Sequence, residues 1–570
     1  MKSMKKLVLV GLVLLASVMV LVGCKNDSVP ETPKFTVTFE TDHGTAPKDL
    51  VVESVTKLTA EQLPSLADTD DYIFEGWQVK GTTTLVQAGF EVTKDVTLVA
   101  KWRDRGTTSG VTFDPPDGTK FFYDEPVTVT LATTEEASIK YKLGEGEWQV
   151  YSGPIEILSQ NTITAYAIKE GLKPSVETSA KYLRELTSIS ITPPTRTVYS
   201  VGEKFDPTGM VVTAEYDDGE TREVNTWKTD FATVTSEKGL NKTVTVSYTE
   251  GENPETATFT VVVFPEEVKV LTDYESPNNT DDTWTYVEFG EWPQTIKAAS
   301  VEVTEDESKK KEMGMFTAYL GSDGNYYVKE KENAYRSGSA YQYSDDTQAG
   351  QGGESEKWFK VEPIVWRVLN KNYSGTGKAL LLAEKILTGG IEWDDNKNNY
   401  MESNIRKWLN GNSGSGEQSD YSGDVGFLQT AFTPDVHNLI ANTIVDNSAR
   451  STTDAEQNLD EATKYICKDT EDKIFLLSEQ EATIAEYGFA AYDTRVEGNT
   501  RIRVTTDYAQ ITGAYQDGTA GYGGWWWLRS PNYHNESVAC IINIDGLATY
   551  SSIVEDASVG VVPALYIELQ

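Results

Sequence analysis

Cysteine and histidine are scarce in this chain of 570 residues, which contains three of each. Cys24, Cys467 and Cys540 stand too far apart for a zinc ribbon or for a small scaffold dense in disulfides. The three histidines are also widely separated, which argues against a histidine-rich metal site. We therefore expect neither a bound metal nor a cofactor.

Basic side chains are also few. The chain has 50 Lys and Arg against 88 Asp and Glu, which gives a net charge of −38. Nucleic acids and anionic lipid surfaces are bound through concentrations of Lys and Arg, so we expect no nucleic-acid partner. The simplest interpretation of the acidity is the solubility of an exposed envelope protein. Scattered calcium sites are the alternative.

The apolar run over residues 7–22 is short for a membrane span and follows three lysines, the pattern of a secretory signal peptide. It ends in Leu21-Val22-Gly23-Cys24, which resembles the bacterial lipobox. The resemblance implies that residues 1–23 are removed and that Cys24 becomes the diacylated first residue. An uncleaved anchor helix is the alternative.

A lipidated Cys24 would attach the protein to a membrane, because two or three acyl chains anchor stably where one is marginal. Lys25 follows it, and no Asp stands there to favour retention at the inner membrane. We therefore expect a lipid-anchored protein of the bacterial cell envelope, at the outer membrane or cell surface.

The length is too great for one hydrophobic core, so several domains are expected. After a linker at residues 24–33, residues 34–103 carry T-V-T-F at 36–39, F-x-G-W at 74–77 and A-K-W at 100–102. Alternation of apolar and polar residues there predicts strands. This stretch resembles the internalin-type B-repeat, a β-grasp-like module of bacterial surface proteins.

Two further stretches have short alternating strands at regular spacing, which is typical of β-sandwiches. Residues 110–183 contain Y-x-G-P-I at 151–155 and resemble the chitobiase C-terminal-type sandwich. Residues 185–264 contain Y-x-x-G-E-x-F-D at 199–206 and resemble a group-three bacterial immunoglobulin-like domain. We expect these three all-β modules to form a stalk that holds the last domain away from the lipid surface.

The last domain, residues 284–570, is expected to be α+β. Buried strands are predicted at 364–369 and 379–383, and a helix from the N-cap Ser403 to the stop at Gly411. Its motifs resemble those of an uncharacterised bacterial domain family, with a distant likeness to the C-type-lectin-like and formylglycine-generating-enzyme fold. The motifs are F-G-x-x-P-Q (289–294), I-x-W-x-V-L (364–369), I-R-x-W-L-N (405–410), D-K-x-F-L-L-S (472–478), W-W-L-R-S-P (526–531) and a terminal P-A-L (563–565).

Consecutive Trp525, Trp526 and Trp527 are the first candidates for ligand binding. On a strand, Trp525 and Trp527 would share one face and Trp526 would take the other. A solvent-exposed Trp could stack on a sugar or bind a protein. Packing of all three inside the domain is the alternative.

A second group of candidates follows the tryptophans in the sequence. Arg529 either holds a structural hydrogen-bond network or clamps a carboxylate. Tyr533, His534 and Asn535 stand in a loop after Pro531 and are further ligand-binding candidates, because loops on a rigid scaffold commonly carry binding.

Two interpretations of the remaining cysteines are possible. Cys467 and Cys540 either form a disulfide or are two free buried thiols. A formylglycine-generating-type enzyme would need them as a reactive pair, and we find no convincing catalytic constellation. The preferred hypothesis is a non-enzymatic, lipid-anchored surface protein whose last domain binds an extracellular protein or glycan, with functions in adhesion or carbohydrate binding. A purely structural or adhesive envelope protein is the alternative, and the enzyme is a third.

Overall fold

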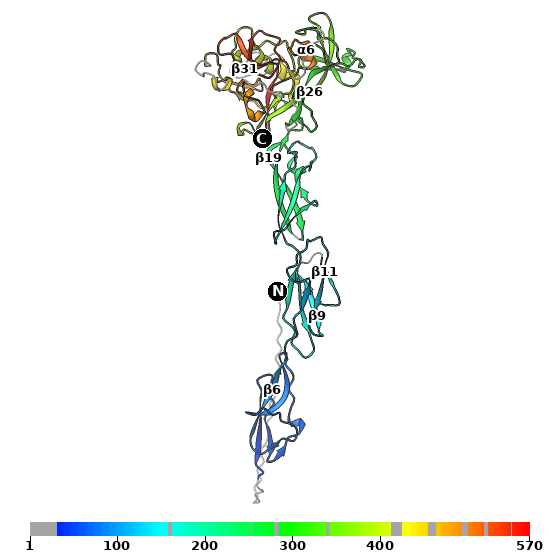
Figure 1. The fold of residues 1–570 in the computed structure, drawn as a ribbon, viewed down its shortest axis with the longest axis vertical. Helices are drawn as coiled ribbons and strands as arrows, with labels where there is room; N and C mark the ends of the chain where they lie inside the picture. Colours follow the sequence, from blue (N-terminus) through cyan, green and yellow to red (C-terminus); the bar gives the residue numbers. More distant parts are fainter. Residues whose placement is uncertain are drawn as a thin grey trace, which may run out of the picture. The chain divides into compact units, whose positions relative to one another are not determined.

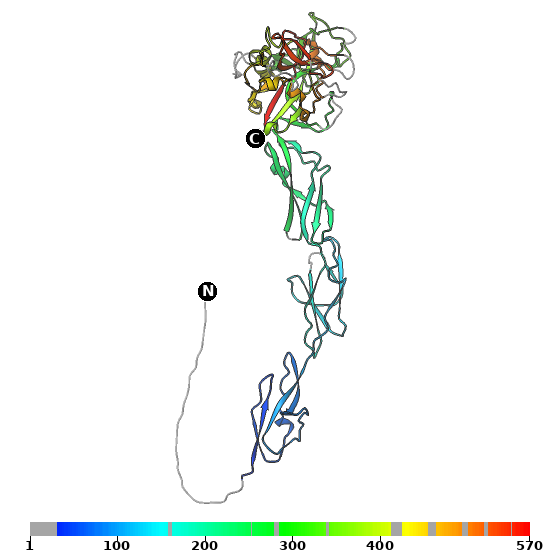
Figure 2. The ribbon, with the colours of Figure 1, turned by 60° about the vertical axis from the view of Figure 1, so that its left-hand side comes forward.

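The computed structural model describes residues 31–157, 162–251, 253–278, 284–337, 341–411, 425–453, 463–492, 500–517, 523–548 and 550–570. The predicted signal peptide and Cys24 lie outside these residues. The described chain falls into two compact units, one ending at Glu185 and one running from Leu186 to Gln570 (Figures 1 and 2). Among the described residues, no helix is both long and apolar enough to cross a membrane.

The first module of unit one is a four-stranded sheet in the order β2-β1-β6-β4. Its central pair, β1 and β6, is parallel, and the other pairs are antiparallel. Alternate residues of β1 enter the core, where Val37 and Phe39 meet Trp77. The strands are β1 (Lys34–Glu40), β2 (Leu50–Glu53), β4 (Tyr72–Val79) and β6 (Val96–Asp104), with a small pair β3 (Thr56–Lys57) and β5 (Glu91–Val92).

The second module has two sheets, β10-β9-β12-β13 and β11-β8-β7. In β12 the residues Ile163, Ala165 and Ala167 are fully buried while their neighbours are half-buried, so one face covers the core between the sheets. The strands are β7 (Thr112–Asp114), β8 (Val127–Ala132), β9 (Ser138–Leu143), β10 (Gln149–Val150), β11 (Ile155–Ile157), β12 (Thr162–Ile168) and β13 (Thr178–Lys181).

Unit two begins with the third module, residues 186–264, which is again made of two sheets, β14-β16-β17 and β15-β20-β19-β18. The β19–β20 hairpin is its longest pairing, and Val244, Val246 and Val261 lie in the core. The strands are β14 (Leu186–Thr192), β15 (Val198–Ser200), β16 (Val211–Tyr216), β17 (Thr221–Val224), β18 (Lys228–Thr229), β19 (Gly239–Glu250) and β20 (Asn253–Phe264), and α1 is Phe231–Val234.

The third module continues into the last domain without a break in packing. Val198 and Phe264 of the third module belong to the same hydrophobic core as Trp366 of the last domain. The connecting segment contains β21 (Lys269–Leu271), which pairs with β22 (Tyr286–Ile296) as an edge strand. Lys238 Nζ donates to the carbonyl of Glu568 at 2.6 Å, and Figures 1 and 2 show the C-terminus beside this module.

The last domain contains β26 (Glu356–Asn370), which Figure 1 labels. It is built on a nine-stranded sheet around this strand, which pairs with β22, β25 and β27. The 15 residues of β26 reach across the domain, and Ile364, Trp366 and Arg367 are fully buried. The other strands are β23 (Lys310–Met313), β24 (Phe316–Leu320), β25 (Tyr326–Lys331), β27 (Lys378–Ala383), β30 (Ile474–Phe475) and β34 (Ala564–Glu568).

Short helices pack on this large sheet, and two small sheets, β28-β29 and β31-β32-β33, belong to the same domain. The predicted helix is α2 (Asn404–Asn410), where the Ser403 hydroxyl accepts from the Arg406 amide and Gly411 closes the helix at φ 62°. The expectation of a multidomain, mainly β chain with an α+β C-terminal region is confirmed. The remaining elements are α3 (Phe427–Ala431), α4 (Ala449–Thr452), α6 (Asp507–Ile511), β28 (Thr443–Val445), β29 (Thr470–Asp472), β31 (Trp526–Pro531), β32 (Val538–Ile542) and β33 (Tyr550–Ile553).

Candidate functional site

Two of the three consecutive tryptophans lie in the core. Trp526 and Trp527 are 0% exposed, and both are on β31, which pairs with β32. Trp526 Nε1 donates to the carbonyl of Arg501 at 3.0 Å, so even its polar edge is used inside the domain. The prediction that Trp526 or Trp527 binds a ligand at the surface is therefore wrong, because both faces of β31 are covered.

Trp525 differs, because it precedes β31 and is only partly buried. Its ring lies 4.2 Å from that of Tyr515, centroid to centroid. The ring of Tyr335 lies 5.4 Å from that of Tyr515, and the Arg336 guanidinium lies 5.2 Å from the same ring. Tyr335 is 37% exposed and Arg336 is exposed. We call Tyr335, Arg336, Tyr515 and Trp525 the Trp525 cluster.

Backbone hydrogen bonds hold the rings of this cluster in place. The Gly560 amide donates to the Trp525 carbonyl at 2.8 Å, and the Tyr515 amide donates to the Ser558 carbonyl at 2.8 Å. On the other side, Gln351 Nε2 donates to the Tyr335 carbonyl at 2.7 Å. The cluster thus combines aromatic surface with a cation on a fixed backbone, which suits stacking on a sugar or a peptide side chain.

Arg529 holds a structural hydrogen-bond network and is 0% exposed. Its NH1 forms an ion pair with Glu481 and also donates to the Leu476 carbonyl at 2.8 Å. Its NH2 donates to the Asp446 carbonyl at 3.1 Å. A ligand carboxylate has no access to this guanidinium, so the structural alternative holds and the clamp does not.

The loop with Tyr533, His534 and Asn535 is at the surface, where His534 and Asn535 are exposed. Buried Asn398 supports it, because its amide donates to the carbonyls of Asn535 at 2.9 Å and of Asn532 and Val538. This loop follows the C-terminal end of β31, whereas Trp525 precedes the N-terminal end of that strand. Six residues of strand separate the two by roughly 20 Å, so they do not form one site.

Cys467 and Cys540 are free thiols, so the disulfide alternative is not what the structure shows. Cys540 is buried, and its Sγ donates to the Pro531 carbonyl at 3.8 Å. Burial raises the pKa of the Cys540 thiol well above its ordinary value, and burial also raises the pKa of Cys467. Both thiols are therefore protonated at neutral pH and are poor nucleophiles.

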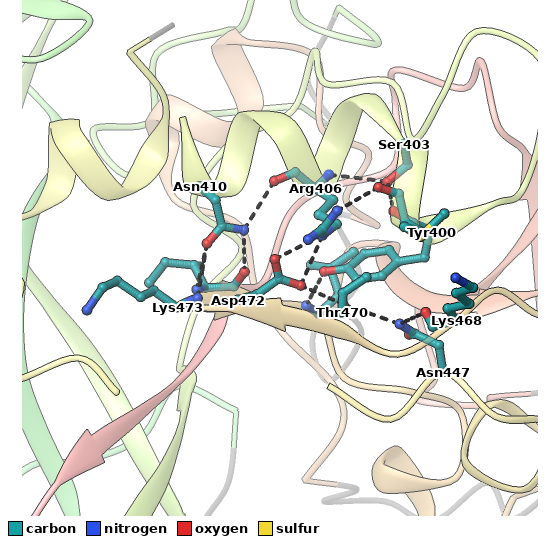
Figure 3. Close-up of polar contacts among 12 residues, drawn as sticks. Tyr400, Ser403, Arg406, Asn410, Asn447, Lys468, Thr470, Asp472 and Lys473 are labelled. Carbon is teal, nitrogen blue, oxygen red and sulfur yellow. Dashed lines mark hydrogen bonds and ion pairs between the residues drawn. The ribbon is translucent and has the colours of Figure 1, made fainter. Parts of the chain in front are cut away.

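A buried ion pair joins two of the motifs singled out in the sequence (Figure 3). Arg406 of α2 and Asp472 of β29 are both 0% exposed, with Arg406 Nε 2.9 Å from Asp472 Oδ1. Thr470 Oγ1 donates to Asp472 Oδ2 at 2.7 Å. Asn410 binds the backbone of Ile474 through both ends of its amide. Arg406, Asn410 and Asp472 are all buried, so these residues hold the domain together and do not face solvent.

Among the residues that the structure describes, no group of three or more His, Cys, Asp or Glu side chains is placed to hold a metal ion. The sequence analysis missed Tyr335, Arg336 and Tyr515 as site residues. No local pattern marks them, because they come from segments about 180 residues apart that only the fold brings together.

Comparison with known families matches two parts of the chain. Residues 376–569 match the model of a domain of unknown function, DUF6273, and residues 192–263 match the bacterial Ig-like domain, group 3. No curated protein matches the chain. The Ig-like and unknown-function domains indicate a bacterial surface or adhesive-type protein.

Replacing Asp472 with Asn should lower the free energy of unfolding by about 3–5 kcal/mol, because the Arg406 guanidinium would stay buried without its counter-charge. Denaturant unfolding followed by Trp fluorescence measures the loss. The matched control is Glu354→Gln, which breaks an exposed pair with Lys331 and should change stability by less than about 0.5 kcal/mol. Equal losses in the two variants would contradict the assigned role of the buried pair.

The native protein from residue 25 onward should react slowly with a thiol reagent at Cys467 and hardly at all at Cys540, because burial keeps both thiols protonated. Two thiols should titrate after unfolding without reductant. Rapid reaction of both thiols in the native state would reopen the enzyme hypothesis. Titration of no thiol after unfolding would mean that they are bridged.

Proposed function

We propose that this chain is a lipid-anchored bacterial cell-surface protein whose last domain binds an extracellular glycan or protein at the Trp525 cluster. The observation that carries the proposal is Trp525, which packs against the core but stays partly exposed while Trp526 and Trp527 are fully buried. Its ring lies against buried Tyr515, beside exposed Tyr335 and Arg336. An aromatic ring left partly in water gives up some of the stability of burial, so the partly exposed Trp525 beside exposed Tyr335 favours a binding role.

The chemistry of the cluster favours a glycan or a peptide. The rings of Tyr335 and Trp525 offer apolar surface to the C–H face of a sugar, and the Tyr335 hydroxyl can donate to a sugar oxygen. Arg336 lies over Tyr335 and Tyr515 at 5.4 and 5.2 Å, and its fork of N–H groups suits carboxylates and carbonyls. Ring stacking and hydrogen bonding act only at contact distance. The ligand would therefore bind directly on the surface of the last domain.

A binding role also fits the chain better than catalysis. The only two cysteines among the described residues have pKa values raised by burial. The buried carboxylates of Asp472 and Glu481 are engaged with Arg406 and Arg529. These groups are occupied in structural contacts, so the protein is proposed not to be an enzyme.

The anchor is supported by the lipobox-like residues 21–24. Cells that express the full chain should carry it in the membrane fraction and label it with a fatty acid. Cys24→Ala should remove the label and release the protein, and Cys467→Ser, the matched control, should leave both unchanged. A membrane-bound, labelled Cys24→Ala variant would contradict lipidation at this residue.

A screen of glycans and extracellular proteins with the chain from residue 25 onward tests the binding role. Trp525→Ala should weaken a saturable hit at least tenfold, about 1.4 kcal/mol, because it removes the central ring. Tyr335→Ala should weaken the same hit. The screen is run with calcium and with a chelator, and affinities are measured by calorimetry.

The controls for this screen are Trp148→Ala, a partly buried Trp in the other unit, and Tyr550→Ala, an exposed ring on β33. Both should bind as the unaltered protein does. A hit that survives Trp525→Ala and Tyr335→Ala would place the site elsewhere. A blank screen from folded protein would favour the purely structural role.

A further inference from the structure

A cavity of about 440 Å³ lies inside unit two, between the third module and the last domain. The third module contributes Arg196 and Asp206, the connecting segment contributes Asp273, and the last domain contributes Trp284 and Lys371. Four threonines complete most of its polar wall. Its volume falls in the range of ordinary small-molecule sites. It does not include any residue of the Trp525 cluster.

The walls of this junction cavity are held in a fixed position. The Ser200 hydroxyl is buried, donates to the Val268 carbonyl at 2.6 Å and accepts from the Val270 amide at 2.9 Å. Val198 and Val270, which line the cavity, also belong to the core shared by the third module and the last domain. A ligand would therefore meet a preformed site, with little ordering left to lose on binding.

Most charges around the cavity are already engaged within the protein. Arg196 NH2 lies 2.5 Å from Glu203 Oε2, and its Nε donates to the Val198 carbonyl at 3.1 Å. Asp206 Oδ1 accepts from both the amide and the hydroxyl of Thr208. These groups form part of the cavity wall and have little hydrogen-bonding capacity left for a ligand.

Lys371 is the exception. None of the hydrogen bonds and ion pairs among the described residues involves its ammonium group, although it lines the cavity. Lys371 is exposed as a residue, and partial desolvation lowers its pKa. Its ammonium can therefore pair with an anion that enters the cavity.

Trp284 supplies the apolar part of the wall. The guanidinium of buried Arg367 lies 5.1 Å from its ring centroid, and the ring also packs closely against Gly488. A Cβ on Gly488 would come within 2.1 Å of Trp284 Cζ2, so this glycine keeps the ring in position. The ring is partly exposed and is rigidly placed at the edge of the cavity.

We propose that the junction cavity binds an acidic monosaccharide unit, a uronic or sialic acid. The sugar's carboxylate pairs with Lys371, its hydroxyls bond to the threonines and to Asp273, and its C–H face lies against Trp284. Lys371, which has no hydrogen-bond or ion-pair partner among the described residues, matches one carboxylate, while Asp206 and Asp273 disfavour a doubly charged phosphate. The hydroxyls of Thr195 and Thr272 already donate to the Thr208 carbonyl and to Asp273, but they can still accept hydrogen bonds from a polyhydroxylated ligand.

The test measures binding of glucuronic acid, N-acetylneuraminic acid, glucose and inorganic phosphate to the chain from residue 25 onward, by calorimetry and saturation-transfer NMR. One of the two sugar acids should bind saturably, and glucose and phosphate should bind at least tenfold more weakly. Lys371→Met should reduce the affinity for the sugar acid at least tenfold. Added salt should weaken that binding.

Three controls make the result specific. Lys385→Met alters a half-buried lysine that lines a separate cavity of about 230 Å³, and it should bind the sugar acid normally. Tyr550→Ala removes an exposed ring on β33 that lines neither site, and it should also bind the sugar acid normally. Lys371→Gln is a second variant, and the thermal unfolding midpoint of each variant shows whether it is folded.

The proposal is overturned if neither sugar acid binds saturably, or if folded Lys371→Met and Lys371→Gln both keep the affinity. It is also overturned if phosphate binds as tightly as the sugar acid, because the site would then be a general anion site. Loss of binding in Lys371→Met with retention in Lys385→Met supports it.

Discussion

The last domain depends on satisfying guanidinium groups that are wholly removed from water. Moving a charge out of water costs several kcal/mol unless hydrogen bonds or an opposite charge replace the lost hydration. The fold meets this cost in different ways, and each way fixes the distance between two segments that are remote in sequence. The five arginines concerned are Arg367, Arg406, Arg501, Arg503 and Arg529.

Carboxylates form ion pairs with only some of these five arginines. Arg406 pairs with Asp472, and Arg529 pairs with Glu481. Arg501 instead donates to four backbone carbonyls, among them that of Gly546 at 2.7 Å. Arg367 lies between the rings of Trp284 and Phe489, and its NH2 donates to the Tyr487 carbonyl at 3.3 Å. Its Nε and NH1 have no hydrogen-bond partner among the described residues, and burial lowers its pKa to about 9, which still leaves it charged at neutral pH. Loops tied to such centres become a rigid frame for the surface.

This arrangement explains why the most conspicuous motifs of the sequence do not form a site. Arg406, Asn410 and Asp472 bind one another's segments in the interior, and Arg529 binds the chain around Leu476. Surface chemistry is left to residues just outside the strands, such as Trp525 before β31. The same logic applies at the junction, where the third module is packed against the last domain and leaves a polar cavity beside Trp284.

Local features of the chain were set by the sequence alone. Strand alternation in β12, the Ser403 cap and the Gly411 stop of α2 depend on neighbouring residues only, so they were predictable. Which of the three tryptophans stays in contact with water could not be predicted from the sequence, because it depends on which other parts of the chain cover β31. Two further features also depend on the fold: the contact between Tyr335 and Tyr515, and the free state of Cys540. The same holds for Lys371, which has no partner within the described part of the chain, since no sequence spacing encodes which groups meet.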